Sequence, residues 1–124
     1  KRLTPSGDGR TTVSSSPSLS FNSYQELSLR TLPKKLSKRD LLTMSAIGIA
    51  GEAGEFTEIC KKHLFHDKSI DVSHATSELG DVLWYLSLAA HSLGIKLEEI
   101  ATENIKKLKA RYPDGYTDQY YKKG

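Results

Sequence analysis

Four carboxylates in the chain are spaced in a way that could hold a metal ion. Glu52 and Glu55 are three residues apart, and so are Glu78 and Asp81. Helical residues three apart differ by about 60° in direction, so each pair projects from nearly one face of its helix. If the two segments are antiparallel helices joined by a short turn, they pack side by side. The two acidic pairs would then face each other across one groove.

The residues that flank these carboxylates are mostly apolar. Acidic side chains that converge at an apolar seam repel one another and raise one another's pKa. A hard divalent cation removes this cost, and Mg²⁺ prefers carboxylate and water oxygens and bridges to substrate phosphates. One such pair is usually a solvated helix face, but two pairs on adjacent amphipathic helices favour a metal site. The flanking apolar residues are Ile49, Ala50, Ala53, Phe56, Leu79, Val82 and Leu83.

Glycines interrupt the same two segments. Gly48, Gly51 and Gly54 recur every three residues, and Gly80 lies between Glu78 and Asp81. Each glycine in a helix interior costs up to about 1 kcal/mol relative to alanine. We therefore expect a partner helix or a ligand to approach closely at these positions.

The elements that must position the carboxylates are helices. Apolar residues recur with the helical period, and no segment alternates in the manner of a strand. Ser37 and Asp40 resemble a capping box, Asp71 or Ser73 can cap the third helix, and Gly94 is suited to end it. The pattern predicts an all-α protein, an antiparallel bundle of four to five helices. The predicted helices span residues 21–32, 40–64, 73–93 and 97–111.

Length and composition predict one domain preceded by an arm. The chain has 124 residues, which suits a single domain. Residues 1–20 are basic and rich in serine with few large aliphatic residues, so we expect a flexible arm there. The single cysteine, Cys60, excludes an internal disulfide framework and a multi-cysteine zinc site.

Charge and hydropathy exclude several classes of protein. Residues 1–39 hold eight Lys and Arg against two acids, whereas residues 40–124 hold ten against thirteen. The predicted helical part is thus mostly acidic, which argues against nucleic acid as a partner. No stretch reaches the roughly 18 apolar residues of a membrane span, and no signal-peptide segment is visible. We expect no membrane association and a cytoplasmic protein.

The carboxylate pattern resembles that of a known family. Glu52-x-x-Glu55 followed by Glu78-x-x-Asp81 is similar to the E-x-x-E…E-x-x-D signature of the MazG-like nucleoside triphosphate pyrophosphohydrolases, members of the all-α NTP pyrophosphatase superfamily. The strings GEAGEFTE and ELGDVLWY also resemble this family. The resemblance covers residues 21–117 and leaves a tail at 118–124. It further includes Tyr24-Gln25 and Asn104-x-x-Lys107-x-x-x-Arg111-Tyr112-Pro113.

The resemblance implies a fold, a reaction and a metal. The implied fold is a helical bundle completed by dimerisation, as a homodimer or a dimer of dimers. The implied reaction hydrolyses a (deoxy)nucleoside triphosphate to the monophosphate and pyrophosphate, with Mg²⁺ replaceable by Mn²⁺. Carried onto this chain, Glu52, Glu55, Glu78 and Asp81 are the metal ligands. Either Glu52 or Glu55 also orients or deprotonates the attacking water, and the resemblance does not choose between them.

The fourth predicted helix carries candidate substrate ligands. Asn104, Lys107 and Arg111 form one stripe, and Asn104 lies beside an apolar line, so we expect it to face inward. Without the resemblance, Lys107 and Arg111 are better explained as basic residues near a helix C-terminus. With it, all three are expected to bind substrate. Trp84 and Tyr85 are candidates for stacking on a base, although aromatic residues on an apolar helix are more often core.

Two other functions fit the same residues. One is a related enzyme with another phosphate substrate, such as a dUTPase/dCTPase-like enzyme or a phosphoribosyl-ATP pyrophosphohydrolase. The other is a non-catalytic helical dimer that binds nucleotides or a protein partner. His63 and His66 are interpreted as surface residues, and His74 as incidental.

Overall fold

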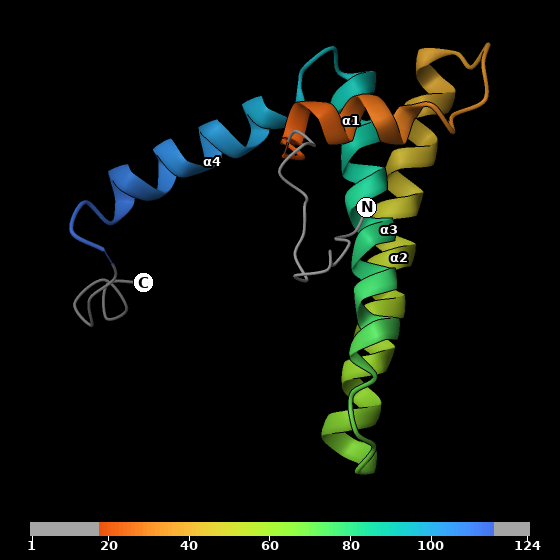
Figure 1. Cartoon of the computed structure of the whole chain (residues 1–124), viewed down its shortest axis with the longest axis vertical. Coiled ribbons are helices and arrows are strands. Elements are labelled where there is room, and N and C mark those ends of the chain that lie inside the picture. The colour runs from red at the N-terminus through yellow and green to blue at the C-terminus, as the bar shows by residue number, and fades with distance from the viewer. Residues whose placement is uncertain (1–17, 116–124) are drawn as a thin grey trace, which may run out of the picture.

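The computed structural model describes residues 18–115 and is all-α over that range. Most of the expected arm at 1–20, the tail at 118–124 and the predicted domain end at 117 lie outside the described residues. Figure 1 shows two long helices side by side, a short helix across one end of them and a fourth helix that points away. The helices are α1 (Phe21–Leu29), α2 (Lys38–His66), α3 (Val72–Ser92) and α4 (Leu97–Arg111).

The helices begin where the sequence provides capping side chains. The hydroxyl of Ser37 accepts a hydrogen bond from the Asp40 amide at 3.0 Å, which completes the predicted capping box at the start of α2. Asp71, one of two predicted candidates, caps α3 by accepting from the His74 amide at 3.0 Å. Gly94, just beyond α3, has a φ of 75°. This left-handed conformation favours glycine and confirms the predicted end of the helix.

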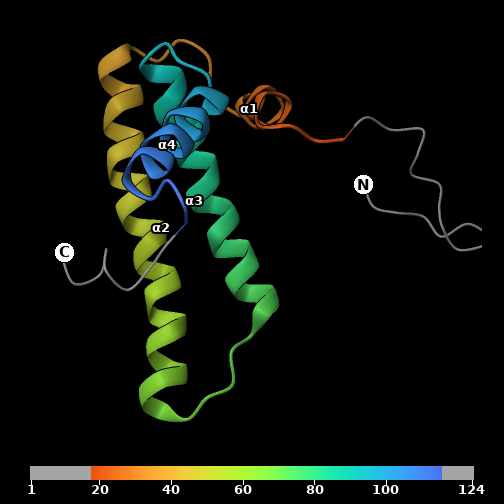
Figure 2. The ribbon, with the colours of Figure 1, turned by 90° about the vertical axis from the view of Figure 1, so that its left-hand side faces the viewer.

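Helices α2 and α3 form an antiparallel hairpin (Figure 2), which carries most of the tertiary contacts. A Cβ atom placed on Gly48 would overlap the ring of Tyr85, so glycine at this position lets α3 approach α2. Nothing lies within 4 Å of the corresponding positions at Gly51, Gly54 and Gly80. The predicted close approach is therefore made within this chain at Gly48, whereas the other three glycines face open space.

Helix α1 is fastened across the open end of the hairpin by polar contacts. The Trp84 indole N–H donates to the Ser28 carbonyl oxygen at 3.0 Å and to Thr31 Oγ1 at 3.1 Å. The buried Gln25 side chain accepts from the Leu97 amide at 2.8 Å, which satisfies the first N–H of α4. These contacts tie α1 both to α3 and to the beginning of α4.

Helix α4 projects away from the hairpin (Figure 1). It contacts α1 and α3 but not α2. Asn22 Nδ2 donates to Glu98 Oε1 at 2.8 Å and adds a second tie near the start of α4. The apolar side chains of Ile100, Ile105 and Leu108 remain exposed along its length.

The single chain buries few hydrophobic residues. Among residues 18–115, the buried hydrophobic side chains are Ala75, Leu88, Ala90 and Leu97. The one buried residue of α2 is Ser45, although this helix has 29 residues. Ile47 on α2 and Leu79 on α3 are 68% and 48% exposed. Over the same residues, no helix has both the length and the hydropathy that a membrane span requires.

Candidate functional site

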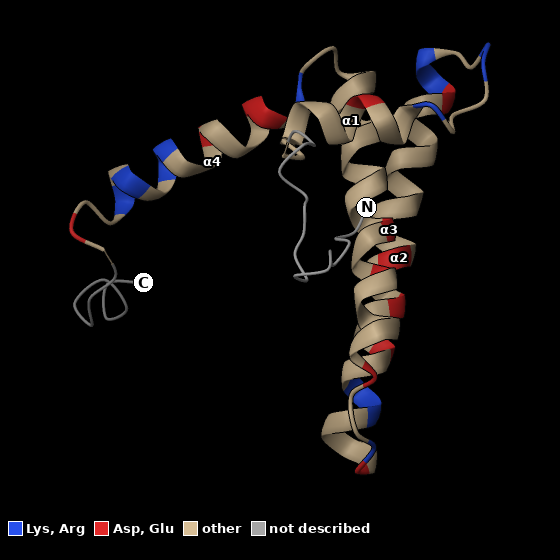
Figure 3. Cartoon of the chain, viewed as in Figure 1, with Lys and Arg blue, Asp and Glu red and all other residues tan. Residues whose placement is uncertain are grey.

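The hairpin brings three of the four predicted carboxylates together. One oxygen each of Glu52, Glu78 and Asp81 lies within 4.8 Å of the others. Glu52 comes from α2 and the other two from α3, so the antiparallel pairing of the helices creates the cluster. Glu52 and Glu78 are half-buried, whereas Asp81 is exposed. Figure 3 shows acidic residues along the middle of the hairpin.

The electrostatics of this carboxylate cluster favour a cation or an additional proton. A hydrogen bond with Glu78 raises the pKa of Glu52, and partial desolvation and the negative charges of Asp81, Glu78 and Glu55 raise it further. No Lys or Arg within residues 18–115 forms an ion pair with Glu52, Glu78 or Asp81. Three carboxylate oxygens with no Lys or Arg partner are the hard donor set that Mg²⁺ or Mn²⁺ prefers. The residues present therefore fit a divalent cation.

The fourth predicted carboxylate, Glu55, lies outside the three-residue cluster. Its negative charge nevertheless contributes to the raised pKa of Glu52. Glu55 lines a neighbouring pocket of about 520 Å³ together with Lys62 and His74. Glu55 therefore lies outside the group of converging carboxylate oxygens, although it is only three residues from Glu52 on the same helix.

Tyr24 of α1 lies close enough to the cluster to feel the charge of Asp81. Burial of its hydroxyl and the negative charge of Asp81 raise the pKa of Tyr24. It lines a mainly apolar pocket of about 790 Å³ between α1, α3 and α4, with Leu83 and Ile105. Gln25, the residue beside it, is buried in contacts between helices and does not line this pocket.

The aromatic pair Trp84 and Tyr85 takes part in packing. Their rings meet edge to face, with centroids 5.0 Å apart and an interplanar angle of 88°. Trp84 donates its N–H to α1, and the Tyr85 ring lies against Gly48 of α2. These contacts account for both residues without a base, so their proposed stacking role has no support in the geometry of the single chain.

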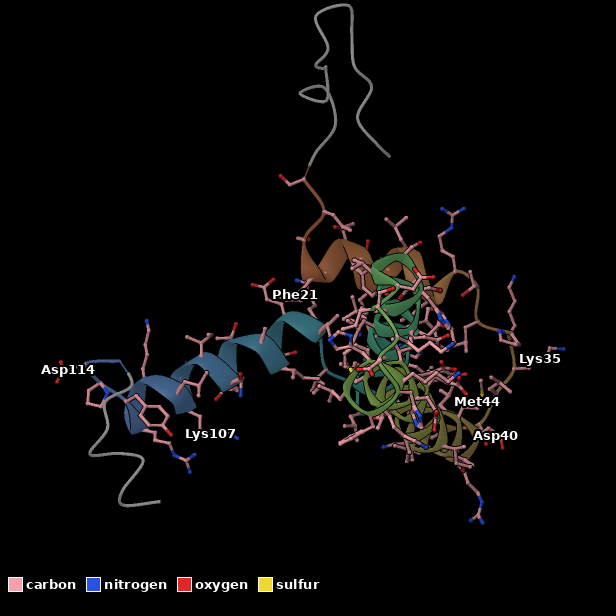
Figure 4. The ribbon with its side chains drawn as sticks, turned by 90° about the horizontal axis from the view of Figure 1, so that it is seen from below. Phe21, Lys35, Asp40, Met44, Lys107 and Asp114 are labelled. Carbon is pink, nitrogen blue, oxygen red and sulfur yellow. The ribbon has the colours of Figure 1, made fainter. Side chains whose placement is uncertain are left out.

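The three candidates on α4 do not reach the carboxylate cluster. Asn104, Lys107 and Arg111 are all exposed, so the expectation that Asn104 faces inward is wrong for the single chain. The reason is that α4 leaves the hairpin after its first turn instead of packing along it. Figure 4 shows Lys107 far out on α4, away from the hairpin. The guanidinium carbon of Arg111 lies 5.9 Å from the centroid of the Tyr112 ring.

His74 is the residue that the sequence argument missed. Its Nε2 lies 3.2 Å from Glu78 Oε2, and the Glu78 side chain is only 16% exposed. His74 is thus in contact with the carboxylate cluster rather than incidental. The signal was present in the sequence, because residues four apart on a helix are neighbours.

The sequence of this chain matches the model of a known protein family. The model of the MazG nucleotide pyrophosphohydrolase domain matches residues 42–116. This chain belongs to that family. The Gene 37 protein of Mycobacterium phage L5 is 33% identical over 79 residues, which cover 60% of this chain and 68% of that protein. A comparison with solved structures gave no significant match.

The MazG match covers the residues that carry the site. It begins inside α2 and includes all four predicted carboxylates and the three candidates on α4. The initial resemblance to the family and the all-α architecture are therefore confirmed. Helix α1, with Tyr24 and Gln25, lies before the matched range.

Proposed function

We propose that this MazG domain is a Mg²⁺-dependent nucleoside triphosphate pyrophosphohydrolase. It cleaves a (deoxy)nucleoside triphosphate between the α- and β-phosphates and releases the monophosphate and pyrophosphate. The observation that carries the proposal is the cluster of Glu52, Glu78 and Asp81, which forms no ion pair with Lys or Arg among residues 18–115 and which the hairpin holds open to solvent at Asp81. A family of nucleotide pyrophosphohydrolases supplies the class of reaction.

In this proposal each acidic residue has a distinct task. Glu52, Glu78 and Asp81 hold Mg²⁺, which Mn²⁺ can replace. When bound, the cation neutralises phosphate charge and lowers the pKa of a coordinated water. Glu55 lies next to the cluster but outside it, so it is free to accept a proton from the attacking water or to orient it. Glu52, the other candidate for this role, is one of the three residues whose carboxylate oxygens lie within 4.8 Å of one another.

His74 has a positioning role in this proposal. Its ring contacts Glu78 Oε2 at 3.2 Å, which fixes the rotamer of that carboxylate. Residues that hold a metal ligand in place typically change metal affinity or activity 10- to 100-fold when they are removed. His74 therefore orients Glu78 and does not itself need to touch the substrate.

We further propose that the working protein is a homodimer or a dimer of dimers. Exposed apolar side chains on two parts of the chain support this: Ile47 and Leu79 on the hairpin, and Ile105 and Leu108 on α4. Large exposed apolar patches commonly mark interfaces. A second copy is also a route by which Asn104, Lys107 and Arg111 can reach a triphosphate, since α4 points away from the cluster in its own chain.

The function is tested by product analysis with a panel of nucleoside and deoxynucleoside triphosphates together with phosphoribosyl-ATP. The proposal predicts the monophosphate and pyrophosphate in equal amounts with Mg²⁺ or Mn²⁺ and no products in chelator. Release of phosphate and the diphosphate would contradict cleavage at the α–β bond. Exclusive use of dUTP, dCTP or phosphoribosyl-ATP would restrict the enzyme to one of the related activities. Nucleotide binding without any turnover would favour the non-catalytic dimer.

A further inference from the structure

Helix α4 leaves the end of the hairpin and forms a corner with α3 (Figure 1). A mainly apolar pocket of about 790 Å³ lies where α1, α3 and α4 meet in this corner. Three of its side chains, Leu19, Phe21 and Ile105, are large, hydrophobic and exposed. The described part of the chain thus leaves an apolar surface uncovered in the corner. We call this pocket the corner groove, which is also lined by Tyr24, Leu83 and Ala101.

A second group of exposed hydrophobic residues lies at the closed end of the hairpin. The side chains of Phe65, near the end of α2, and Val72, at the start of α3, are 76% and 70% exposed. Leu64 and Ile70, close to them in the sequence, are exposed as well. We call these four residues the hairpin tip. Large apolar side chains that gather at one end of a molecule are typical of an interaction site.

Hydrogen bonds hold the turn at the hairpin tip in a defined shape. Asp67 ends α2 in the left-handed conformation, with a φ of 54°. His63 Nδ1 lies 2.8 Å from the Lys68 carbonyl oxygen, and the Lys68 amide donates to the Lys62 carbonyl oxygen at 3.3 Å. Because the turn is already ordered, its docking on another surface costs little conformational entropy.

The hairpin tip of a chain cannot fill the corner groove of the same chain. The tip and α4 lie at opposite ends of the hairpin (Figure 2), and the 29 residues of α2 span about 43 Å at 1.5 Å per residue. A two-fold axis across the hairpin exchanges these two ends. Each tip then meets the groove of the other copy, so the same contact is made twice in a closed dimer.

A second copy of the chain suits both surfaces by its size. Among residues 18–115, one copy buries only four hydrophobic side chains and leaves most of its apolar surface in water. The exposed hydrophobic residues of tip and groove would together remove on the order of 700 Å² of each copy from water. An interface of standard size buries about 800 Å² of each partner. The two contacts are therefore large enough to support a stable dimer.

Charged residues at the edges of the two surfaces can pair across such a contact. Lys68 and Asp67 belong to the turn at the tip, whereas Glu98 and Lys109 line the groove. Each edge thus offers one charge of each sign to the other. Pairs of this kind set the orientation of two partners more than their affinity.

We propose that the hairpin tip of each copy docks in the corner groove of a second copy and forms an antiparallel, two-fold symmetric dimer. This inference rests on the dimer of the proposed function, but not on hydrolytic activity, and it names the surfaces in contact. The arrangement brings α4 of one copy to the closed end of the other hairpin. Glu78 lies about 9 Å along α3 from Val72 at that end. Helix α4 of the second copy therefore approaches the carboxylate cluster.

Cross-linking between two single-cysteine variants tests which surfaces meet. Cys60, the only cysteine, is replaced by serine in the full chain, and either Val72→Cys or Ile105→Cys is then added. A short bismaleimide should link these two variants into a covalent dimer when they are mixed. Either variant alone should give little of this product, because the two tips lie at opposite ends of the antiparallel dimer. Mass spectrometry of the intact product identifies the mixed species.

A charge introduced at either surface should dissociate the dimer. Phe65→Asp and Ile105→Asp each place a carboxylate in the apolar contact and should raise the dissociation constant of the dimer by roughly 30-fold or more. Leu27→Asp is the matched control, because Leu27 is exposed on α1 outside both surfaces, and it should leave the constant unchanged. Sedimentation equilibrium measures the constant, and circular dichroism shows whether each variant keeps its helices.

The outcomes distinguish this inference from the proposed function. A dimeric protein that gives no mixed cross-link would overturn the inference and leave the proposed dimer standing. A protein that is monomeric at micromolar concentration would overturn both. Equal weakening by Leu27→Asp would also overturn the inference, because the effect would not belong to the two surfaces. A mixed cross-link in a protein that hydrolyses no triphosphate would support the inference and reject the proposed activity.

Discussion

The α2–α3 hairpin and helix α4 both carry predicted site residues, but only the hairpin brings its residues together. In the hairpin, Glu52, Glu78 and Asp81 converge to within 4.8 Å although Glu52 and Glu78 are 26 positions apart in the sequence. On α4, the stripe of Asn104, Lys107 and Arg111 forms as predicted but faces solvent. Both segments are helical with the expected period. What differs is whether a partner helix lies within the same chain.

The difference shows what a hairpin contributes to a site. A short turn forces two helices to pack along their length, so spacing within each helix fixes the spacing across the groove. Helix α4 follows α3 through Gly94, and among residues 18–115 its hydrogen bonds to α1 lie near its start, at Gln25 and Asn22. Its direction is set by contacts at that end, and its outer residues depend on what else packs against them.

The largest effect is expected from the hairpin carboxylates. Asp81→Asn and Glu78→Gln remove ligands of the proposed metal site, so kcat/KM should fall by more than about 100-fold, since even the loss of supporting residues costs 10- to 100-fold. Steady-state assays of pyrophosphate release measure this. Glu26→Gln, an exposed residue of α1, is the matched control and should leave kcat/KM unchanged. Full activity in Asp81→Asn would reject the assignment of the site.

Substitutions on helix α4 should give the next largest effect. We expect this effect only if α4 contributes to the site of a second copy of the chain. Lys107→Gln or Arg111→Gln removes a charged contact to phosphate, which corresponds to roughly a 10- to 100-fold loss of kcat/KM. If a second copy supplies α4, mixing Arg111→Gln with Asp81→Asn should restore part of the activity, because a mixed dimer contains one intact site. No recovery in mixtures shown to exchange subunits would mean that α4 acts within its own chain, or not at all.

The hairpin packing predicts a smaller, purely structural effect. Gly48→Ala places a methyl group on the Tyr85 ring and should lower the free energy of unfolding by about 1–3 kcal/mol. Gly54→Ala, where nothing lies within 4 Å, should raise it by up to about 1 kcal/mol through helix propensity. Urea unfolding compares the two variants. Loss of stability in Gly54→Ala would indicate that a second copy covers that face.

Much of this molecule was readable from local sequence, and the reasons are physical. The ends of α2 and α3 follow from Ser37, Asp71 and Gly94, because capping depends on neighbours in the chain. The convergence of Glu52 with Glu78 and Asp81 follows from the hairpin. The course of α4 was not readable, since it depends on the distant contact between Gln25 and the Leu97 amide. The packing role of Trp84 was the commoner expectation for an aromatic residue on an apolar helix, but its hydrogen-bond partners, Ser28 of α1 and Thr31 just beyond that helix, were not readable.

The smallest expected effect is a pH dependence of stability that arises from Glu52. Its pKa is raised in the folded chain, so the folded state binds this proton more tightly than the unfolded state does. The group therefore costs stability as the pH rises through its raised pKa. Without metal, Glu52→Gln should unfold at a higher temperature than wild type at neutral pH, and the difference should vanish below about pH 4. A difference that does not change with pH would contradict this.

The most direct test of the central claim is metal binding by the hairpin itself. Mn²⁺ titrations followed by electron paramagnetic resonance count ions bound to the wild type and to Glu78→Gln, with Glu103→Gln on α4 as a control for lost charge. If Glu52, Glu78 and Asp81 hold a divalent cation, the wild type and Glu103→Gln bind Mn²⁺ with the same affinity and Glu78→Gln loses that site. Equal binding by all three proteins, or none by the wild type, would contradict the account.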